Sequence, residues 1–436
     1  MIKKFYFILA MVFLLFAFAS CGYNPSGSGE GEGENDSDIT VTTTDIWDGS
    51  IASSFSSGNG TENDPYKIST AAELAFLAKS VNDGESYQGK YLLLNNNIDL
   101  NGLEWTPIGN GINSFMGIFD GKGLTVKNLK ITQGVRYDYE YTTGKEISYS
   151  DAGLFATVQD VSIQNLIIDG ATINIYNDKF VYAHHVGALC GTVRAYQGTS
   201  VISNIDIRNV TLAIVADSSA RSDSTYIGGA IGYIYAYNNT TTTVSLVDVI
   251  SSVSTSDGYG SENHIGTIIG ASLTLDSTFN LENSVGYQTL SVSFEQYYYN
   301  DSKNFCGAIG VAQASALPFS IKNVFSKTTV NKPALDSDMT PLSAIVSHAI
   351  IGDSYYFTLI NDTTGIGYTL ENVFGCVEHV DEAGEKQIFT KLYELPEGLE
   401  FSQINCQGCE TLPENHGFDT AIWDLSDLAN PKLKKQ

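Results

Sequence analysis

The sequence predicts an all-β protein, a single-stranded parallel β-helix that begins with a short helical cap. A signature of an apolar residue, any residue, Asn and usually another apolar residue recurs seven times, and a segment of small residues recurs in phase with it. After residue 85 each repeat contains short strand-like runs separated by Gly, Asn, Asp and Ser, and no segment has a long helical period. A repeat of this length indicates stacked units that bury a shared core.

The Asn position of the signature defines the period of the repeat. Subtracting successive positions gives spacings of 37, 39, 44, 35, 40 and 49 residues. Equivalent residues of neighbouring turns lie about 4.8 Å apart, so stacked amides can hydrogen-bond to one another as a ladder. Buried amides without such partners would be costly. We therefore predict one inward-facing ladder, whose members are Asn128, Asn165, Asn204, Asp248, Asn283, Asn323 and Asn372.

The small-residue segments begin and end with residues that have little or no side chain. Clear examples are Gly187 to Gly191, Gly228 to Gly232 and Gly266 to Gly270. Glycine at fixed places in successive turns indicates sharp bends, or strands that approach too closely for a larger side chain.

Residues 1–20 are predicted to be a lipoprotein signal peptide. Lys3 and Lys4 precede an apolar run that ends at Phe18, and small residues lead to Cys21. A basic start, an apolar stretch and small residues before the cleavage point are typical of secretory signals. The junction resembles a bacterial lipobox, which implies that Cys21 becomes the acylated N-terminus. An uncleaved anchor helix is the alternative, but the apolar run is short for a membrane span.

Residues 21–44 are predicted to be a flexible, acidic tether rich in Gly and Ser, because such a composition cannot bury apolar surface. The chain carries 23 Lys and Arg against 49 Asp and Glu, a formal charge of −26. This balance argues against nucleic acid as a partner. We expect an outer-membrane lipoprotein that contacts the membrane through its lipid and is exposed on the cell surface.

Residues 45–90 are predicted to cap the stack at its N-terminal end. Thr70 and Glu73 have the spacing of a capping box, in which the Thr hydroxyl and the Glu carboxylate each accept a backbone N–H. Leu74, Leu77, Ala78 and Val81 share one face of the helix that follows. The parallel β-helix is predicted over residues 91–385, and a C-terminal cap over 386–436.

The close cysteine pair Cys406 and Cys409 lies in the predicted C-terminal cap. In an exported protein it is most simply a local disulfide or two free thiols. A zinc site is the alternative, with His379 and His416 as the available further ligands. A single C-x-x-C is a weak zinc signal, so we predict no metal and no cofactor.

The small-residue blocks, each followed by a strand with Asn or Asp, resemble the GLUG repeats of bacterial surface proteins. Segments before and after the repeats also resemble that family, including its members attached to immunoglobulin A metalloproteases. These segments are Glu62 to Ile68, Asn97 to Leu100, Trp105 to Gly109, Phe115 to Gly123, Phe418 to Trp423 and Pro431 to Leu433. The resemblance implies a right-handed β-helix and a surface location, and it implies no known activity.

No catalytic motif stands out in the sequence. None of the six histidines lies in a His-Glu-x-x-His motif, so zinc peptidase chemistry is unsupported. His184 and His185 would face opposite sides of a strand, which favours a turn or surface role over a shared metal. Asp99, Asp120, Asp138 and Glu140 are candidate carboxylates for a glycoside hydrolase or lyase, but turn chemistry also explains Asp beside Gly.

Clusters of tyrosine are the best indication of a binding site. Tyrosine beside Asn or Asp can stack on sugar rings and donate hydrogen bonds, although tyrosine is also common in strands. The candidate ligand-binding residues are Tyr137, Tyr139, Tyr141, Tyr235, Tyr237, Tyr297, Tyr298 and Tyr299. We predict a non-catalytic adhesion or ligand-binding rod for a host protein or glycan. A carbohydrate-active enzyme and a structural envelope spacer are the alternatives.

Overall fold

The computed structural model is all-β apart from one helix, and its strands form large, mainly parallel sheets, which confirms this part of the predicted fold class. The described residues belong to one compact unit, Thr42–Gln436. The structure describes residues 43–140, 146–177, 181–216, 222–256, 262–293, 303–314, 318–331, 345–353, 368–381, 383–393 and 402–434. Cys21 and the predicted signal peptide and tether lie outside these residues.

The larger sheet, sheet I, contains sixteen of the described strands, and only β25 pairs antiparallel within it. Its central order is β1-β4-β5-β10-β14-β17-β19-β21-β24-β25. The strands are β1 Thr44–Ile46, β2 Tyr66–Ile68, β3 Tyr91–Leu94, β4 Asn97–Asp99, β5 Ile118–Lys127, β6 Lys130–Ile131, β10 Ser162–Asp169, β11 Thr172–Asn177, β14 Thr199–Ala216, β17 Thr241–Ser256, β19 Thr278–Ser293, β21 Phe319–Asn331, β24 Tyr368–Val380, β25 Lys386–Phe389, β26 Ser402–Ile404 and β27 Gln407–Gly408.

The second sheet, sheet II, contains eleven of the described strands in the order β7-β8-β12-β15-β18-β16-β13-β9, with β20, β22 and β23 following β18. These strands are β7 Val135–Glu140, β8 Glu146–Ala152, β9 Phe155–Gln159, β12 Val181–Gly187, β13 Cys190–Ala195, β15 Ser222–Gly228, β16 Ile231–Ala236, β18 Glu262–Thr274, β20 Lys303–Ala314, β22 Ile345–Ser347 and β23 Ile351–Asp353. A separate pair joins β28, Trp423–Asp424, to β29, Lys432–Leu433.

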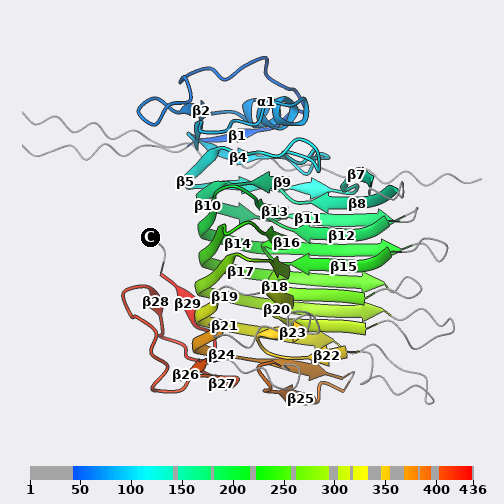
Figure 1. Cartoon of the computed structure of the whole chain (residues 1–436), viewed down its shortest axis with the longest axis vertical. Coiled ribbons are helices and arrows are strands. Elements are labelled where there is room, and N and C mark those ends of the chain that lie inside the picture. The colour runs from blue at the N-terminus through cyan, green and yellow to red at the C-terminus, as the bar shows by residue number, and fades with distance from the viewer. Residues whose placement is uncertain are drawn as a thin grey trace, which may run out of the picture. The chain divides into compact units, whose positions relative to one another are not determined.

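The chain alternates between the two sheets, and each strand pairs in parallel with its equivalent one repeat later. In sheet I, β10 pairs with β14, β14 with β17, β17 with β19 and β19 with β21. In sheet II, β12 pairs with β15 and β13 with β16. The strands therefore lie one above another in Figure 1 in the order of the repeats.

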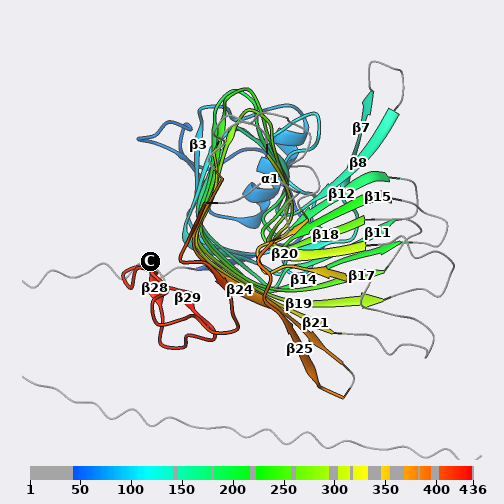
Figure 2. The ribbon, with the colours of Figure 1, turned by 60° about the horizontal axis from the view of Figure 1, so that its bottom comes forward.

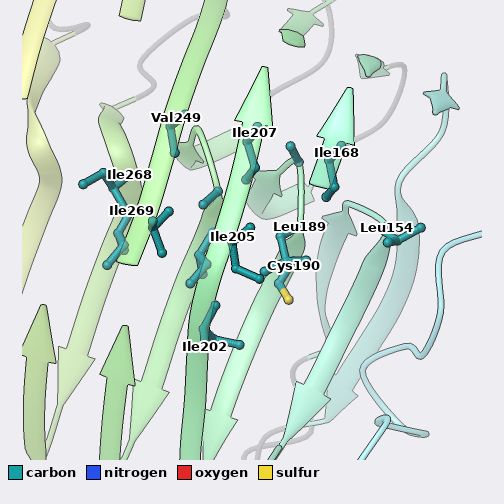
Figure 3. Close-up of a cluster of buried hydrophobic side chains, with 14 of the residues drawn as sticks. Leu154, Ile168, Leu189, Cys190, Ile202, Ile205, Ile207, Val249, Ile268 and Ile269 are labelled. Atoms are coloured by element: carbon teal, nitrogen blue, oxygen red, sulfur yellow. The ribbon is translucent and has the colours of Figure 1, made fainter. Parts of the chain in front are cut away.

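The core lies between the sheets and runs through the stack. Buried aliphatic side chains from strands of both sheets pack together there. Figure 3 shows part of this core, with Ile168, Ile205 and Val249 from sheet I and Cys190 and Ile269 from sheet II. Strands whose core faces are this apolar are typical of parallel sheets.

Helix α1, Ala71–Asn82, covers the N-terminal end of the core. The predicted capping box is confirmed: Thr70 Oγ1 accepts from the Glu73 amide, and the Glu73 carboxylate accepts from the Thr70 amide at 3.1 Å. Leu74, Leu77 and Val81 are fully buried in the core. The helix therefore buries the apolar end that terminal repeats of a stack must cover.

The small-residue segments lie where strands of sheet II turn and approach one another. A Cβ on Gly228 would lie 1.9 Å from the Ile231 carbonyl oxygen and 2.6 Å from the Gly270 nitrogen. A Cβ on Gly191 would lie 2.8 Å from the Ala152 nitrogen. Both approaches leave no room for a side chain, as the sequence predicts.

The Asn column is a kink in β10, β14, β19, β21 and β24 of sheet I rather than an ordinary inward position. Asn165, Asn204, Asn283, Asn323 and Asn372 all have φ between 46° and 56°, a left-handed conformation that Asn tolerates better than most residues. Their side chains are half-buried, so the prediction of a buried inward row is wrong. The column is selected by backbone conformation as well as by hydrogen bonding.

Amide–amide hydrogen bonds run along much of this column. The Nδ2 group of each Asn donates to Oδ1 one repeat earlier, from Asn204 to Asn165 at 2.7 Å, from Asn323 to Asn283 at 2.9 Å and from Asn372 to Asn323 at 2.8 Å. Asn405, which the sequence signature missed, continues the column by donating to Asn372 at 3.0 Å. Each amide thus satisfies its neighbour where the strand pairing is interrupted.

Asn128 belongs to a different column. Its Nδ2 group donates to Asp99 at 2.7 Å, and its equivalents one and two repeats later are Gly170 and Asn209, both also at positive φ. The prediction that Asn128 joins the other Asn residues in one row is therefore wrong. The first repeats therefore have a second left-handed kink, whereas β17, β19 and β21 have only the one at Leu246, Asn283 and Asn323.

Asp248 is also misplaced by the sequence signature. Ile205 pairs with Val247, so Leu246 lies opposite Asn204, while Asp248 pairs with Asp206. Leu246 has φ of 54°, although leucine is disfavoured in this conformation. The Asn column is therefore interrupted at Leu246, between Asn204 and Asn283.

We expect Leu246→Asn to stabilise the protein by about 1–2 kcal/mol. The substitution relieves the left-handed leucine and restores hydrogen bonds to Asn204 and Asn283. Chemical denaturation of the variant and the parent measures the difference. Leu246→Ala is the matched control, since it removes the side chain without supplying an amide; equal stability of the two variants would contradict the expected gain from the ladder.

The C-terminal segment, residues 409–434, follows β27 and packs on the outside of sheet I. Leu412, Phe418 and Trp423 form a second apolar cluster with Val285, Phe325 and Phe374 of the sheet. The Tyr287 hydroxyl donates to the Pro431 carbonyl at 2.7 Å, and β29 packs against β17 and β19. This segment therefore covers an apolar column that would otherwise face solvent, and Figure 2 shows it beside β24.

Candidate functional site

A group of three tyrosines lies at the ends of two neighbouring strands of sheet II. Tyr196 directly follows β13, Tyr235 is on β16, and Tyr237 directly follows β16. The ring centroids of Tyr196 lie 4.4 Å from Tyr237 and 5.8 Å from Tyr235, and those of Tyr235 and Tyr237 are 5.5 Å apart. All three side chains are half-buried, so each ring is fixed by packing and keeps an exposed part. We call these residues the tyrosine cluster.

Strand register brings the tyrosine cluster together. Arg194 on β13 pairs with Tyr235 on β16, and Ala195 pairs with Ala236. The Tyr237 amide donates to the Ala195 carbonyl at 3.1 Å, which carries the pairing one residue past the strands. Since alternate residues share a face of a strand, Arg194 and Tyr196 lie on the same face as Tyr235 and Tyr237.

Arg194 connects the tyrosine cluster to the antiparallel pair β7–β8. Its guanidinium donates to the Gly111 carbonyl at 2.8 Å and to the Tyr137 hydroxyl at 3.3 Å, and lies 5.6 Å from the Tyr137 ring centroid. Tyr137 stacks on Tyr149, its cross-strand partner, at 5.4 Å. Burial raises the pKa of Tyr137, so its hydroxyl stays protonated. The result is a continuous array of fixed rings with one cation.

A polar group lies beneath these rings where β12 and β13 meet. His185 Nδ1 lies 2.8 Å from Asp151 Oδ1 and 2.9 Å from Thr192 Oγ1, and Thr157 Oγ1 donates to Asp151 Oδ2 at 2.7 Å. The His185 ring stacks on Tyr233 at 4.6 Å. We call these residues the histidine cluster.

The histidine cluster has the geometry of a structural network. Asp151 is fully buried and His185 is 4 % exposed. Asp151 and Thr192 contact the same ring nitrogen, whereas acid–base relay in a catalytic triad places the carboxylate on one nitrogen and the nucleophile on the other. Burial raises the pKa of Tyr233 well above its usual value, so this phenol also stays neutral. A satisfied buried network of this kind fixes the turn between the strands.

The structure places some of the predicted tyrosines and not others. Tyr137, Tyr235 and Tyr237 lie in the ring array described above. Tyr139 is on β7, with its side chain outside the described residues, and Tyr141, Tyr297, Tyr298 and Tyr299 lie outside the described residues altogether. Tyr196 was missed, although Arg194-Ala195-Tyr196 matches Tyr235-Ala236-Tyr237 one repeat later.

The prediction of a turn or surface role for His184 and His185 is wrong. Both lie within β12 and both are buried, His184 completely. They face opposite sides of the strand, as the sequence predicts. Neither ring nitrogen of His184 has a hydrogen-bond partner among the described residues. Burial lowers the pKa of His184 to about 4, so it is neutral at pH 7.

The candidate carboxylates are engaged in structural hydrogen bonds. Asp99 accepts from the Asn101 amide and from Asn128, and Asp120 accepts from the Lys122 amide and from Asn165. The side chains of Asp138 and Glu140 lie outside the described residues. Asp99 and Asp120 thus hold kinks of sheet I in place.

The cysteines of the described segments are free thiols. Cys406 and Cys409 are half-buried, and burial raises the pKa of each thiol. Within the described ranges, no three His, Cys, Asp or Glu side chains come together in a way that could hold a metal ion. None of the described helices is both long enough and apolar enough to cross a bilayer.

Comparisons with known proteins find similarity in fold and in parts of the sequence. No protein-family model matches it. It is 28% identical over 158 residues to a "Putative Gly-rich membrane protein" of Evansella cellulosilytica, covering 36% of the chain and 16% of that protein. It is 28% identical over 200 residues to Halomucin of Haloquadratum walsbyi, covering 43% of the chain and 2% of that protein. The chain thus spans less than a fifth of the length of either relative.

A solved structure is similar over most of the chain. It is a "putative immunoglobulin A1 protease" from Bacteroides ovatus, with a TM-score of 0.50 and 14% sequence identity, and the match covers 88% of this chain and 96% of that one. At this identity the likeness concerns the fold alone. The chain therefore shares its β-rich architecture with that Bacteroides protein.

Proposed function

We propose that this protein is a surface-anchored lipoprotein that binds a ligand without catalysis, and that its body is a right-handed parallel β-helix. The strands recur in parallel, in sequence order, and alternate between two sheets, as the turns of such a helix would. The name of one relative, a putative Gly-rich membrane protein, supports a surface location. Attachment to the outer membrane through acylated Cys21 is tested by the mass of the mature N-terminus.

The tyrosine cluster is the observation that carries the binding proposal. Tyr196, Tyr235 and Tyr237 present three fixed, half-exposed rings within 6 Å of one another. Ordering such rings on binding costs little conformational entropy, because the strand ends already hold them. Phenol rings with their hydroxyls suit both the apolar faces and the hydroxyls of a ligand.

A glycan is the ligand class that we favour. Sugar rings present an apolar face to an aromatic ring and hydroxyls to the groups around it, and the cluster supplies both. A host protein is the alternative, because tyrosine and arginine are also enriched in protein interfaces. The enzyme alternative gains no support from Asp99, Asp120 or Asp151, whose carboxylates are engaged in structural hydrogen bonds.

Binding of the purified full chain to an array of glycans and host matrix proteins tests this proposal. For a ligand found on the array, we expect Tyr235→Ala with Tyr237→Ala to weaken binding about tenfold or more, since each ring contributes about 1 kcal/mol. Tyr176→Ala is the matched control, because Tyr176 is 54% exposed on β11 of sheet I. Unchanged binding by the double variant, or depolymerisation of the ligand by the parent chain, would contradict the proposal.

A further inference from the structure

A pocket of about 170 Å³ lies where sheet I meets the C-terminal segment. The C-terminal segment contributes Asn430, and the sheet contributes Ile250, Ser251, Tyr287, Gln288, Thr289, Lys327 and Thr329. These residues come from β17, β19, β21 and the turn before β29, so the C-terminal segment supplies one wall of the pocket. It lies on sheet I, whereas the tyrosine cluster lies on sheet II.

The walls of the pocket are held in place by hydrogen bonds. The Tyr287 hydroxyl donates to the Pro431 carbonyl at 2.7 Å, and its ring lies 5.9 Å from that of Phe325. Asn430 Nδ2 donates to Asp427 at 2.9 Å. Both side chains are therefore oriented before any ligand arrives, which reduces the entropic cost of binding.

The hydroxyls of Thr289 and Thr329 and the ammonium of Lys327 are further polar groups of the lining. Thr289 and Thr329 are directly paired on neighbouring parallel strands, which lie about 4.8 Å apart, so both side chains are on the same face of the sheet. Lys327 Nζ lies 2.8 Å from Glu378 Oε1, an ion pair that uses one of its three donor hydrogens. The pocket can therefore donate several hydrogen bonds, and its one cation is already ion-paired.

The chemistry of the lining excludes most ligand classes. The lining residues include no carboxylate, which disfavours a hard cation. Lys327 is already paired with Glu378, a carboxylate that it shares with Lys386, and the chain has a net charge of −26, which disfavours an anion. Hydroxyl and amide groups around one tyrosine ring and one isoleucine suit a compact ligand with both polar and apolar faces. The volume is well below the roughly 300 Å³ at which drug-sized ligands begin, so the ligand is about one ring in size.

We propose that this pocket binds one neutral, polyhydroxylated ring, such as a single hexose unit. Tyr287 and Ile250 contact its apolar face, while Thr289, Thr329 and Asn430 hydrogen-bond its hydroxyls. The proposal does not rest on the tyrosine cluster, because it uses different residues on a different sheet.

Titration of the full chain with single sugars, followed by ligand-observed NMR, tests the pocket. The probes are glucose, galactose, mannose and N-acetylglucosamine, with glucuronate and N-acetylneuraminate as anionic comparisons. We expect saturable binding of at least one neutral sugar, about five- to tenfold weaker in Thr289→Val and in Thr329→Val. Thr211→Val is the matched control, because Thr211 lies in the same outward column through Ser252 but outside the pocket.

Three outcomes would overturn the proposal. They are no saturable binding by any neutral sugar, tighter binding of the anionic sugars, and equal affinity of the Thr289→Val variant and the Thr211→Val control. Tyr235→Ala with Tyr237→Ala is expected to leave this binding unchanged, so failure of the pocket and failure of the tyrosine cluster are told apart.

Discussion

Lowering the pH from 7 to 4 is expected to cost this protein about 3 kcal/mol of stability through one buried side chain, His184. Burial lowers the pKa of His184 from its usual 6.5 to about 4, and His185 and Arg136 nearby add to this effect. Between pH 6.5 and pH 4, His184 is therefore protonated in the unfolded chain and neutral in the folded chain. The stabilisation is fully present above pH 6.5 and is lost as the pH falls through this range.

Two substitutions separate the charge of His184 from its packing. His184→Leu and His184→Gln both remove the titrating group, and both are expected to flatten the dependence of unfolding free energy on pH between 6.5 and 4. Chemical denaturation at pH 7, 5.5 and 4.5 measures it. Ser150 and Thr225, the cross-strand neighbours of His184, are unchanged in both variants. If the unfolding free energy of both variants depended on pH as steeply as that of the parent, His184 would be ruled out as the source.

Much of the fold could be predicted because the same backbone geometry recurs in every repeat. A glycine such as Gly228 is required wherever two strands touch, and an Asn is favoured wherever the backbone takes a left-handed turn. Such constraints leave the same residue type at the same place in successive repeats. The register of one repeat was mistaken because Leu246-Val247-Asp248-Val249 fits the signature two residues away from the true kink, where leucine replaces the expected Asn.

The candidate sites were only partly predictable, because they depend on which residues the register brings together. Tyr235 and Tyr237 stand out as a local cluster, but Tyr196 joins them only through the pairing of β13 with β16. Asp151 and His185 are far apart in the sequence, and only the pairing of β8 with β12 makes them partners. The pocket was not foreseen because one of its walls comes from a segment that no repeat pattern marks.

The second large effect on stability is expected from Asp248, and it depends on pH in the opposite direction. Asp248 is directly paired with Asp206 and is covered by the strand β29 of the C-terminal segment. Burial, and then repulsion by Asp206, raise the pKa of Asp248 from 3.8 to about 7, although Lys432 and Arg208 act against the shift. Arg208 Nη2 lies 2.9 Å from Asp206 Oδ2, so the charge of Arg208 stabilises the carboxylate of Asp206 more than that of Asp248.

Folding raises the pKa of Asp248. Its contribution to the free energy of unfolding is therefore fully favourable below pH 4 and is lost as the pH rises from 4 to 7. The full shift corresponds to about 4 kcal/mol, and water at this half-buried group reduces the expected loss to about 2–3 kcal/mol. Asp248→Asn removes the ionisation and keeps the shape. We expect the variant to exceed the parent in stability by that amount at pH 8 and to match it at pH 4.

The site of the loss should be the C-terminal segment, because β29 is the element that desolvates Asp248. Hydrogen exchange at pH 8 is expected to be faster in residues 422–434 of the parent than in Asp248→Asn, while exchange in the core strands of sheet II stays the same. Asp424→Asn is the matched control, since Asp424 is an exposed carboxylate on the same segment. If Asp424→Asn stabilises the segment as much as Asp248→Asn does, general charge reduction in an acidic chain explains the gain, and the buried carboxylate pair does not.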